Sequence, residues 1–265
     1  MTKVNSLPIG IFDSGVGGIS VLKHIRELLP HENLLYFADS KFAPYGNKSP
    51  EFIRARARYL AGFLIEQGAK ALVVACNTAT AAAVNLLREN YAVPIIGMEP
   101  AVKPAAIVSK TGVIGVLATS GTLKSAQFAA LLESYGQNVQ VVTQACHGLV
   151  ECIERGELNT PATKILLNTY LQPLLDAGAD TIVLGCTHYP FVRKLIEELV
   201  GEEVILVDTG AAVARHLKRR LLQTDLLTGL DKPGQANFWT NSQSVCAKQV
   251  ISQLWGASAD TVILD

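Results

Sequence analysis

Residues 68–78 read GAKALVVACNT, and residues 178–188, 110 positions further on, read GADTIVLGCTH. Each stretch is a Gly-Ala turn, a short apolar run with β-branched residues, and a cysteine followed by hydrogen-bonding side chains. A continuous apolar run of this length predicts a buried strand of a parallel sheet. Cys76 and Cys186 therefore fall just past the carboxyl ends of two strands, at the edge of an open α/β sheet where ligands bind. Two such ends could place the thiols on opposite faces of one small molecule, so that one removes a proton and the other returns it.

The rest of the chain alternates strand-like and helix-like segments, which predicts an α/β fold. The expected strands span residues 9–12, 34–38, 72–75, 94–97, 113–117, 138–142, 181–184 and 204–208. Matching turns, strands and cysteines of the two halves are offset by about 106 to 110 residues. This regularity favours internal duplication, although every α/β protein repeats a strand-helix unit.

The last forty residues are less regular and contain two apolar segments, 238–240 and 262–264, that read as strands. Both could return to complete the sheet of the first half. We therefore predict a first domain made of residues 1–98 plus 208–265, and a second domain made of residues 99–207.

Composition limits the classes of function. The 265 residues are 49% hydrophobic and 17% charged with zero net charge, so a large core is available and nucleic acid is an unfavourable partner. No apolar stretch reaches the roughly 18 residues that span a membrane, and residues 1–7 do not form a signal peptide. An odd number of cysteines, five, without the spacing of a secreted framework predicts the reducing cytoplasm.

Cys76 is the first candidate for chemistry. It leads Asn77 and Thr78 into a helix, and a helix N-terminus favours the thiolate and lowers the pKa of a thiol. A buried structural cysteine is the alternative interpretation, and the matched setting of Cys186 argues against it.

Cys186 is followed by Thr187 and His188, and His188 could accept or supply the thiol proton. Zinc needs about four ligands, and no second cluster of Cys or His accompanies this pair, so we expect no metal. Asp13 and Ser14 follow the first strand and should lie at the same sheet edge. The glycines of residues 15–18 lack the spacing of a nucleotide-binding loop and predict a tight turn with close backbone approach.

Further candidates surround this edge. Glu151 is the acidic counterpart of Asp13 in the second half, although taken alone it reads as a surface helical residue. Neutral groups that could hold a carboxylate without a cation come from the following positions: Tyr45, Gly46, Asn77, Thr78, Thr119, Thr122 and Thr187.

Together these motifs resemble the glutamate racemases, within the cofactor-independent aspartate and glutamate racemases. The resemblance rests, in family order, on residues 13–18, 44–46, 75–79, 99–101, 118–122 and 184–190. It implies two pseudo-symmetric, doubly wound α/β domains with mainly parallel sheets facing each other across the active site. It also implies cofactor-independent interconversion of L- and D-glutamate, which supplies D-glutamate for peptidoglycan and so for cell wall and cell shape. Members of the family are often homodimers.

The resemblance assigns roles to individual residues. Cys76 and Cys186 match the two catalytic thiols, and Asp13, Glu151 and His188 match the assisting acidic and imidazole groups. In the family each thiol acts on one enantiomer, which implies that Cys76 deprotonates D-glutamate and Cys186 deprotonates L-glutamate. The substrate-binding positions that it implies are Asp13, Ser14, Pro44, Tyr45, Gly46, Asn77, Thr78, Thr119, Thr122, Thr187 and His188. Residue 147 is His where the family often has Pro, which bears on the loop beside Glu151.

Three alternatives remain open from the residues alone. The first is a racemase for another substrate, such as aspartate or a hydantoin. The second is a non-catalytic amino-acid-binding protein with incidental thiols. The third is a thiol-disulfide oxidoreductase, which would need Cys76 and Cys186 to approach to roughly 6 Å between their Cα atoms.

Overall fold

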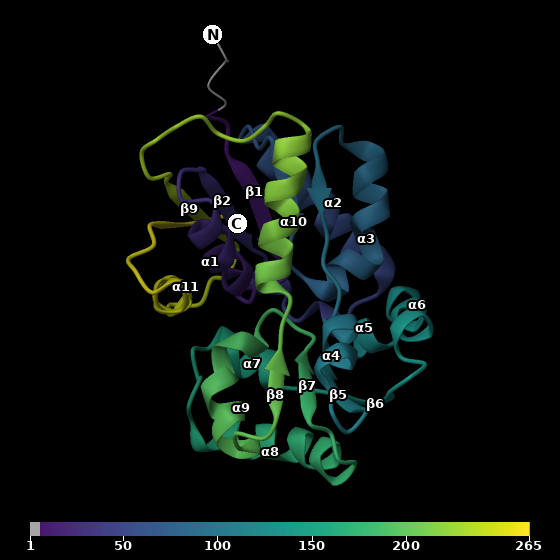
Figure 1. Ribbon diagram of the computed structural model, residues 1–265. Coiled ribbons are helices and arrows are strands. Elements are labelled where there is room, and N and C mark those ends of the chain that lie inside the picture. The colour runs from purple at the N-terminus through teal and green to yellow at the C-terminus, as the bar shows by residue number, and fades with distance from the viewer. Residues whose placement is uncertain (1–5, 265) are drawn as a thin grey trace.

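The computed structural model describes residues 6–264 and contains two parallel β-sheets, stacked end to end and surrounded by helices (Figure 1). Most of residues 1–7, on which the signal-peptide prediction depends, lie outside the described residues. The elements in chain order are β1 (Ile9–Asp13), α1 (Ile19–Leu28), β2 (Leu34–Ala38), η1 (Ser40–Phe42), η2 (Tyr45–Asn47), α2 (Pro50–Glu66), β3 (Ala71–Val74), α3 (Asn77–Asn90), β4 (Ile95–Ile96), α4 (Val102–Val108), β5 (Val113–Ala118), α5 (Ser120–Leu123), α6 (Ala126–Tyr135), β6 (Gln140–Ala145), α7 (Leu149–Glu154), α8 (Pro161–Asp176), β7 (Thr181–Leu184), η3 (Tyr189–Val192), α9 (Arg193–Val200), β8 (Ile205–Val207), α10 (Gly210–Gln223), β9 (Ala236–Thr240), α11 (Ala247–Trp255) and β10 (Thr261–Ile263).

The two sheets repeat one strand order. The larger sheet runs β10-β9-β2-β1-β3-β4 and the smaller runs β6-β5-β7-β8, and all their recorded pairs are parallel. The order β2-β1-β3-β4 therefore recurs as β6-β5-β7-β8, which is the outcome expected if one unit has been duplicated. The predicted fold class, two α/β domains with parallel sheets, is confirmed.

The C-terminal strands extend the larger sheet. β9 pairs with β2 in a register that places Phe238 opposite Tyr36, and β10 pairs with β9. The larger sheet thus combines strands from both ends of the chain, whereas the smaller sheet lies wholly between residues 113 and 207. The domain boundaries near residues 98 and 207 stay a prediction.

Three apolar clusters hold the layers together. α2 and α3 pack on one face of the larger sheet, and α1, α10 and α11 supply buried residues to a cluster on its other face. In the smaller sheet, α4 and α6 cover one face, and α8 and α9 contribute to the same cluster as α1 and α10. This shared cluster crosses from one domain to the other, so burial of apolar surface stabilises the domains against each other as well as internally.

The strand ends bring the predicted site residues together. β1, β3 and β7 are buried along their whole length, as their apolar composition predicts. Ser14, Cys76, Thr119 and Cys186 follow β1, β3, β5 and β7, and all four line one cavity between the two sheets.

Candidate active site

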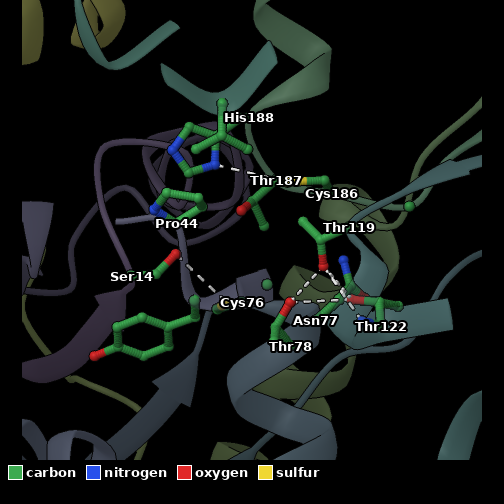
Figure 2. Close-up of a pocket in the computed structure, with 14 residues that line it drawn as sticks. Ser14, Pro44, Cys76, Asn77, Thr78, Thr119, Thr122, Cys186, Thr187 and His188 are labelled. Atoms are coloured by element: carbon green, nitrogen blue, oxygen red, sulfur yellow. Dashed lines mark hydrogen bonds between the residues drawn. The ribbon is translucent and has the colours of Figure 1, made fainter. Parts of the chain in front are cut away.

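A small, largely enclosed cavity of about 10 Å³ lies between the domains, enough for about one water molecule. Its walls contain two residues that the sequence did not single out, Val150 and Gly185. They also contain twelve predicted residues (Figure 2): Ser14, Pro44, Tyr45, Gly46, Cys76, Asn77, Thr78, Thr119, Thr122, Cys186, Thr187 and His188. Each half of the chain thus contributes one thiol and several neutral polar groups.

Cys76 is buried and is the N-cap residue of α3. Its sulfur accepts a hydrogen bond from the Ala79 N–H at 3.4 Å, and its thiol donates to Ser14 Oγ at 3.6 Å. The sequence predicts a lowered pKa at this helix start. In the structure, burial and then the charge of Asp13 raise the pKa of Cys76 well above its usual range, because they outweigh the Ala79 N–H. Burial and the neighbouring carboxyl group therefore favour the protonated thiol.

Asp13 is fully buried beside Cys76 and has four hydrogen-bond donors. Its Oδ1 accepts from the N–H and the hydroxyl of Ser14, and its Oδ2 accepts from the Gly18 N–H and from Thr187 Oγ1 at 3.1 Å. Burial raises the pKa of Asp13, against the opposing effect of His188. Because Thr187 belongs to the other half, Asp13 connects the two domains behind the cavity, whose lining includes Ser14 and Thr187 but not Asp13 itself.

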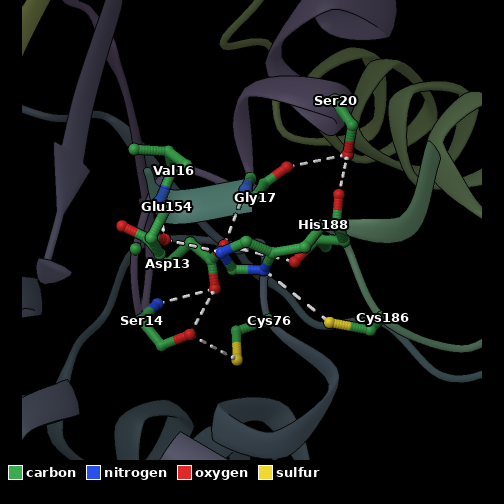
Figure 3. A network of polar contacts seen from close by, with 12 residues as sticks. Asp13, Ser14, Val16, Gly17, Ser20, Cys76, Glu154, Cys186 and His188 are labelled. Carbon is green, nitrogen blue, oxygen red and sulfur yellow. Dashed lines mark hydrogen bonds and ion pairs between the residues drawn. The ribbon is translucent and has the colours of Figure 1, made fainter. Parts of the chain in front are cut away.

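Cys186 belongs to a different arrangement, a chain of three side chains (Figure 3). Its sulfur lies 3.7 Å from Nδ1 of His188, and Nε2 of His188 lies 2.6 Å from Oε1 of Glu154. The same Glu154 oxygen accepts from the Val16 N–H at 2.7 Å. Burial by itself lowers the pKa of His188, but hydrogen bonds to Cys186 and Glu154 outweigh it and raise that pKa well above 6.5.

Glu154 is a residue that sequence reasoning missed. Glu151, which the sequence predicts as the assisting acid, lies one helical turn earlier on α7 and lines a neighbouring small cavity together with His147. The signal that could have found Glu154 is this spacing of three residues, which puts both carboxylates on one side of a helix.

The glycines of residues 15–18 let side chains of the other half approach the backbone closely, and a tight turn with close approach is what the sequence predicts. A Cβ at Gly15 would collide with the Glu154 carboxylate, and a Cβ at Gly17 would collide with the His188 ring. The loop after β1 thus packs directly against the paired side chains of His188 and Glu154.

Neutral groups form the wall opposite His188. The hydroxyls of Thr78, Thr119 and Thr122 form a triangle with distances of 2.8, 3.1 and 3.1 Å that joins the two domains. Asn77 is buried, and neither its amide nitrogen nor its amide oxygen has a hydrogen-bond partner. A buried amide without partners is costly, so the Asn77 side chain is ready to bind a polar ligand.

Tyr45 lines the cavity, but its hydroxyl is engaged elsewhere. It donates to Asp39, a fully buried carboxylate that also binds Arg56 at 2.6 Å and Asn241 at 2.6 Å. The Arg56 guanidinium lies over the Phe42 ring, 4.4 Å from its centroid. This network, which the sequence did not reveal, holds the loop that carries Pro44 and Gly46.

The described residues include no group of three or more His, Cys, Asp and Glu side chains placed to hold a metal ion. Within residues 6–264 no helix has the length and apolar character needed to cross a membrane. The arrangement itself offers two thiols, one imidazole and several neutral hydrogen-bond donors around a space that excludes bulk water.

The fold and the site define a two-domain α/β protein in which each parallel sheet supplies one buried thiol to a shared cavity. A family model described as Asp/Glu/Hydantoin racemase matches residues 9–217. The chain belongs to this family of racemases.

Individual relatives agree with this assignment. A glutamate racemase of Pseudomonas putida is 57% identical over 256 residues, 96% of each chain. The crystal structure of a glutamate racemase isoform from Bacillus anthracis matches with a TM-score of 0.88 and 32% identity, covering 98% of each chain. A glutamate racemase from Francisella tularensis in complex with D-glutamate matches with a TM-score of 0.84 and 29% identity, covering 99% of this chain and 98% of that one. The resemblance to the glutamate racemases is confirmed.

Proposed function

We propose that this protein is a glutamate racemase, an isomerase that inverts the α-carbon of glutamate without a cofactor: one of Cys76 and Cys186 removes the α-proton, and the other supplies a proton to the opposite face. Glutamate is proposed as the substrate because the relatives named above are glutamate racemases. The observation that carries the proposal is the pair of buried thiols that line one closed cavity from the ends of β3 and β7.

In the direction from L- to D-glutamate, the Cys186 thiolate takes the α-proton and leaves the bonding electron pair on the α-carbon. The Cys76 thiol then gives its proton to the opposite face of that carbon. The enzyme is left with a thiol at Cys186 and a thiolate at Cys76, which is the state needed to deprotonate D-glutamate in the reverse direction. In this scheme His188, hydrogen-bonded to Glu154, exchanges a proton with Cys186, and Ser14, hydrogen-bonded to Asp13, is the neighbour of Cys76; the contacts among these side chains support these roles.

The α-hydrogen is a very weak acid, so the carbanion must be stabilised. Negative charge spreads onto the substrate carboxylate, and the unpartnered Asn77 amide and the threonine hydroxyls are placed to donate hydrogen bonds to it. Such donors act more strongly in a site that excludes water. Holding the thiols in line with the α-carbon removes part of the entropic cost.

The proposal is tested by proton NMR of L-glutamate incubated in D2O without an added cofactor. We expect the α-proton signal to disappear while D-glutamate accumulates in a chiral assay. An unchanged signal with folded, reduced protein would overturn the proposal. A panel that includes aspartate and a hydantoin would show whether another substrate of this racemase family is preferred.

The cellular setting is also part of the proposal. D-glutamate made by this reaction would serve peptidoglycan synthesis. Cys76, Cys146, Cys152, Cys186 and Cys246 are all free thiols, which suits the reducing cytoplasm. The homodimer remains a prediction, and light scattering of the purified protein would test it.

A further inference from the structure

A second hollow, far larger than the catalytic cavity, lies next to it between the domains. Its volume is about 720 Å³, and η2, α2 and α3 form one side while α5 and the start of α6 form the other. Gly46 and Thr78 line both this hollow and the catalytic cavity. We call the hollow the entry groove.

A thin seam separates the entry groove from the catalytic cavity. The hydroxyls of Thr78 and Thr119 are 2.8 Å apart across the domain boundary. A Cβ added to Gly121 would lie 3.0 Å from the carbonyl oxygen of Gly46, so the two backbones are in close contact. Because the catalytic cavity has a volume of only about 10 Å³, glutamate enters only when the domains part, and parting at this seam joins the cavity to the groove.

The charge of the groove is opposite to that of the catalytic site. Lys48, Arg54 and Lys124 line the groove, and its lining includes neither Asp nor Glu. Both lysines are exposed, and neither forms an ion pair within the described residues. Arg54 is held by a hydrogen bond from its Nε to the Ala82 carbonyl at 3.0 Å.

The catalytic cavity, in contrast, has no Lys or Arg in its lining; its one cationic group, His188, is paired with the Glu154 carboxylate, and the carboxyl group of Asp13 lies behind the cavity. Glutamate has two carboxylates and one ammonium near neutral pH, so its net charge is about −1. Because this single imidazole is already paired, positive potential outside the cavity would aid the approach of a dicarboxylate.

We propose that the entry groove is a binding site for the carboxylates of the incoming substrate, with Lys48 and Lys124 as the capturing residues. This inference rests on the proposed function, because it assigns the route by which that substrate arrives. The groove raises the local concentration of dicarboxylate beside the seam, and opening of the domains delivers it to the thiols. A cleft with charge of one sign increases capture of the opposite charge, and salt weakens the effect.

The small cavity that Glu151 and His147 line is a poorer route for an anion. It also shares Gly46 and Thr119 with the catalytic cavity, but its volume is only about 20 Å³ and Glu151 lines it. A carboxylate at that mouth repels a dicarboxylate, whereas the entry groove attracts one.

Citrate is a suitable probe of the groove, because it is a tricarboxylate without an amino group and without the α-hydrogen on which the thiols act. Its binding is measured by isothermal titration calorimetry at low ionic strength in the wild type, in K48A/K124A and in K164A. Lys164 is an exposed lysine of α8, outside the groove lining, and serves as the matched control. We expect the dissociation constant to rise at least about fivefold in K48A/K124A and to stay at the wild-type value in K164A.

The same three proteins are then compared as racemases at rising salt. In K48A/K124A we expect kcat/KM for glutamate to fall about fivefold at low salt, with the difference closing near ~0.5 M NaCl as the charges are screened. Citrate binding that is equal in wild type and K48A/K124A, or a loss of kcat/KM that salt does not change, would overturn the proposal. If the wild type does not racemise glutamate, the proposed function fails, and calorimetry with citrate still decides whether the groove binds carboxylates.

Discussion

The two halves of the molecule place a cysteine at the same point of the same strand order and then surround it differently. Cys76 follows β3 in the order β2-β1-β3-β4, and Cys186 follows β7 in the order β6-β5-β7-β8. Cys76 contacts the Ser14 hydroxyl and a helix N–H, with the buried Asp13 beside it. Cys186 contacts His188, which is paired with Glu154.

The difference shows which part of the chemistry the shared backbone determines. Repetition of the strand order brings both thiols to one cavity, as a reaction on two faces of one carbon requires. The groups in contact with each thiol come from loops and helices that the two halves do not share. We therefore expect two bases of equivalent position but unequal proton exchange.

Replacing either thiol should have the largest effect. In C76A or C186A, racemisation should fall by about 10³-fold or more, because one face of the α-carbon loses its acid or base. The remaining thiol can still remove and return a proton on its own side. C76A should therefore exchange the α-proton of L-glutamate with D2O without inversion, and C186A should do so with D-glutamate. Near-normal racemisation by C76A in both directions would show the two-thiol scheme to be wrong.

The assisting acid of the Cys186 side should have the next largest effect. E154Q keeps the size of the side chain but removes the negative charge that binds His188 at 2.6 Å. We expect kcat to fall about 10²-fold, and more with L-glutamate, for which Cys186 must act as the base, than with D-glutamate, for which it acts as the acid. Because the two enantiomers have equal free energies, kcat/KM should fall by the same factor in both directions. E151Q is the matched variant one helical turn away. A larger loss of kcat in E151Q than in E154Q would show that Glu151, the residue that the sequence predicts, is the assisting acid.

Replacing Asn77 should weaken binding of the substrate without lowering the stability of the fold. The Asn77 amide makes no hydrogen bond to another protein group, so N77A removes no protein–protein hydrogen bond and should leave the urea midpoint little changed. A hydrogen bond to a charged group contributes about 1.5–3 kcal/mol, so kcat/KM should fall roughly 10- to 100-fold in both directions. If N77A lowered the urea midpoint and left kcat/KM unchanged, Asn77 would support the fold and would not bind the substrate carboxylate.

The sequence predicts these residues because the signals are local. A buried apolar run ending at a cysteine determines both the strand and the place of the thiol, and the second copy of the pattern confirms the first. What the sequence cannot reveal depends on packing between distant segments. The rotation of α7 against the loop after β1 selects Glu154 over Glu151 as the partner of His188. The burial of Cys76 beside Asp13 reverses the pKa shift that its helix position predicts.

The smallest expected effect concerns the pH dependence of stability. The pKa of His188 is raised in the folded protein above its usual 6.5. The proton on His188 therefore contributes stability that is fully present below about pH 6.5 and is lost as pH rises through the raised pKa. H188Q lacks this contribution, so above pH 6.5 the free energy of unfolding of the wild type should decline relative to that of H188Q, by at most about 1.4 kcal/mol per pH unit. Urea unfolding of both proteins between pH 6 and pH 9 measures the difference. Parallel curves would mean that His188 binds its proton equally well folded and unfolded, and that the Glu154 carboxylate does not hold an imidazolium beside Cys186.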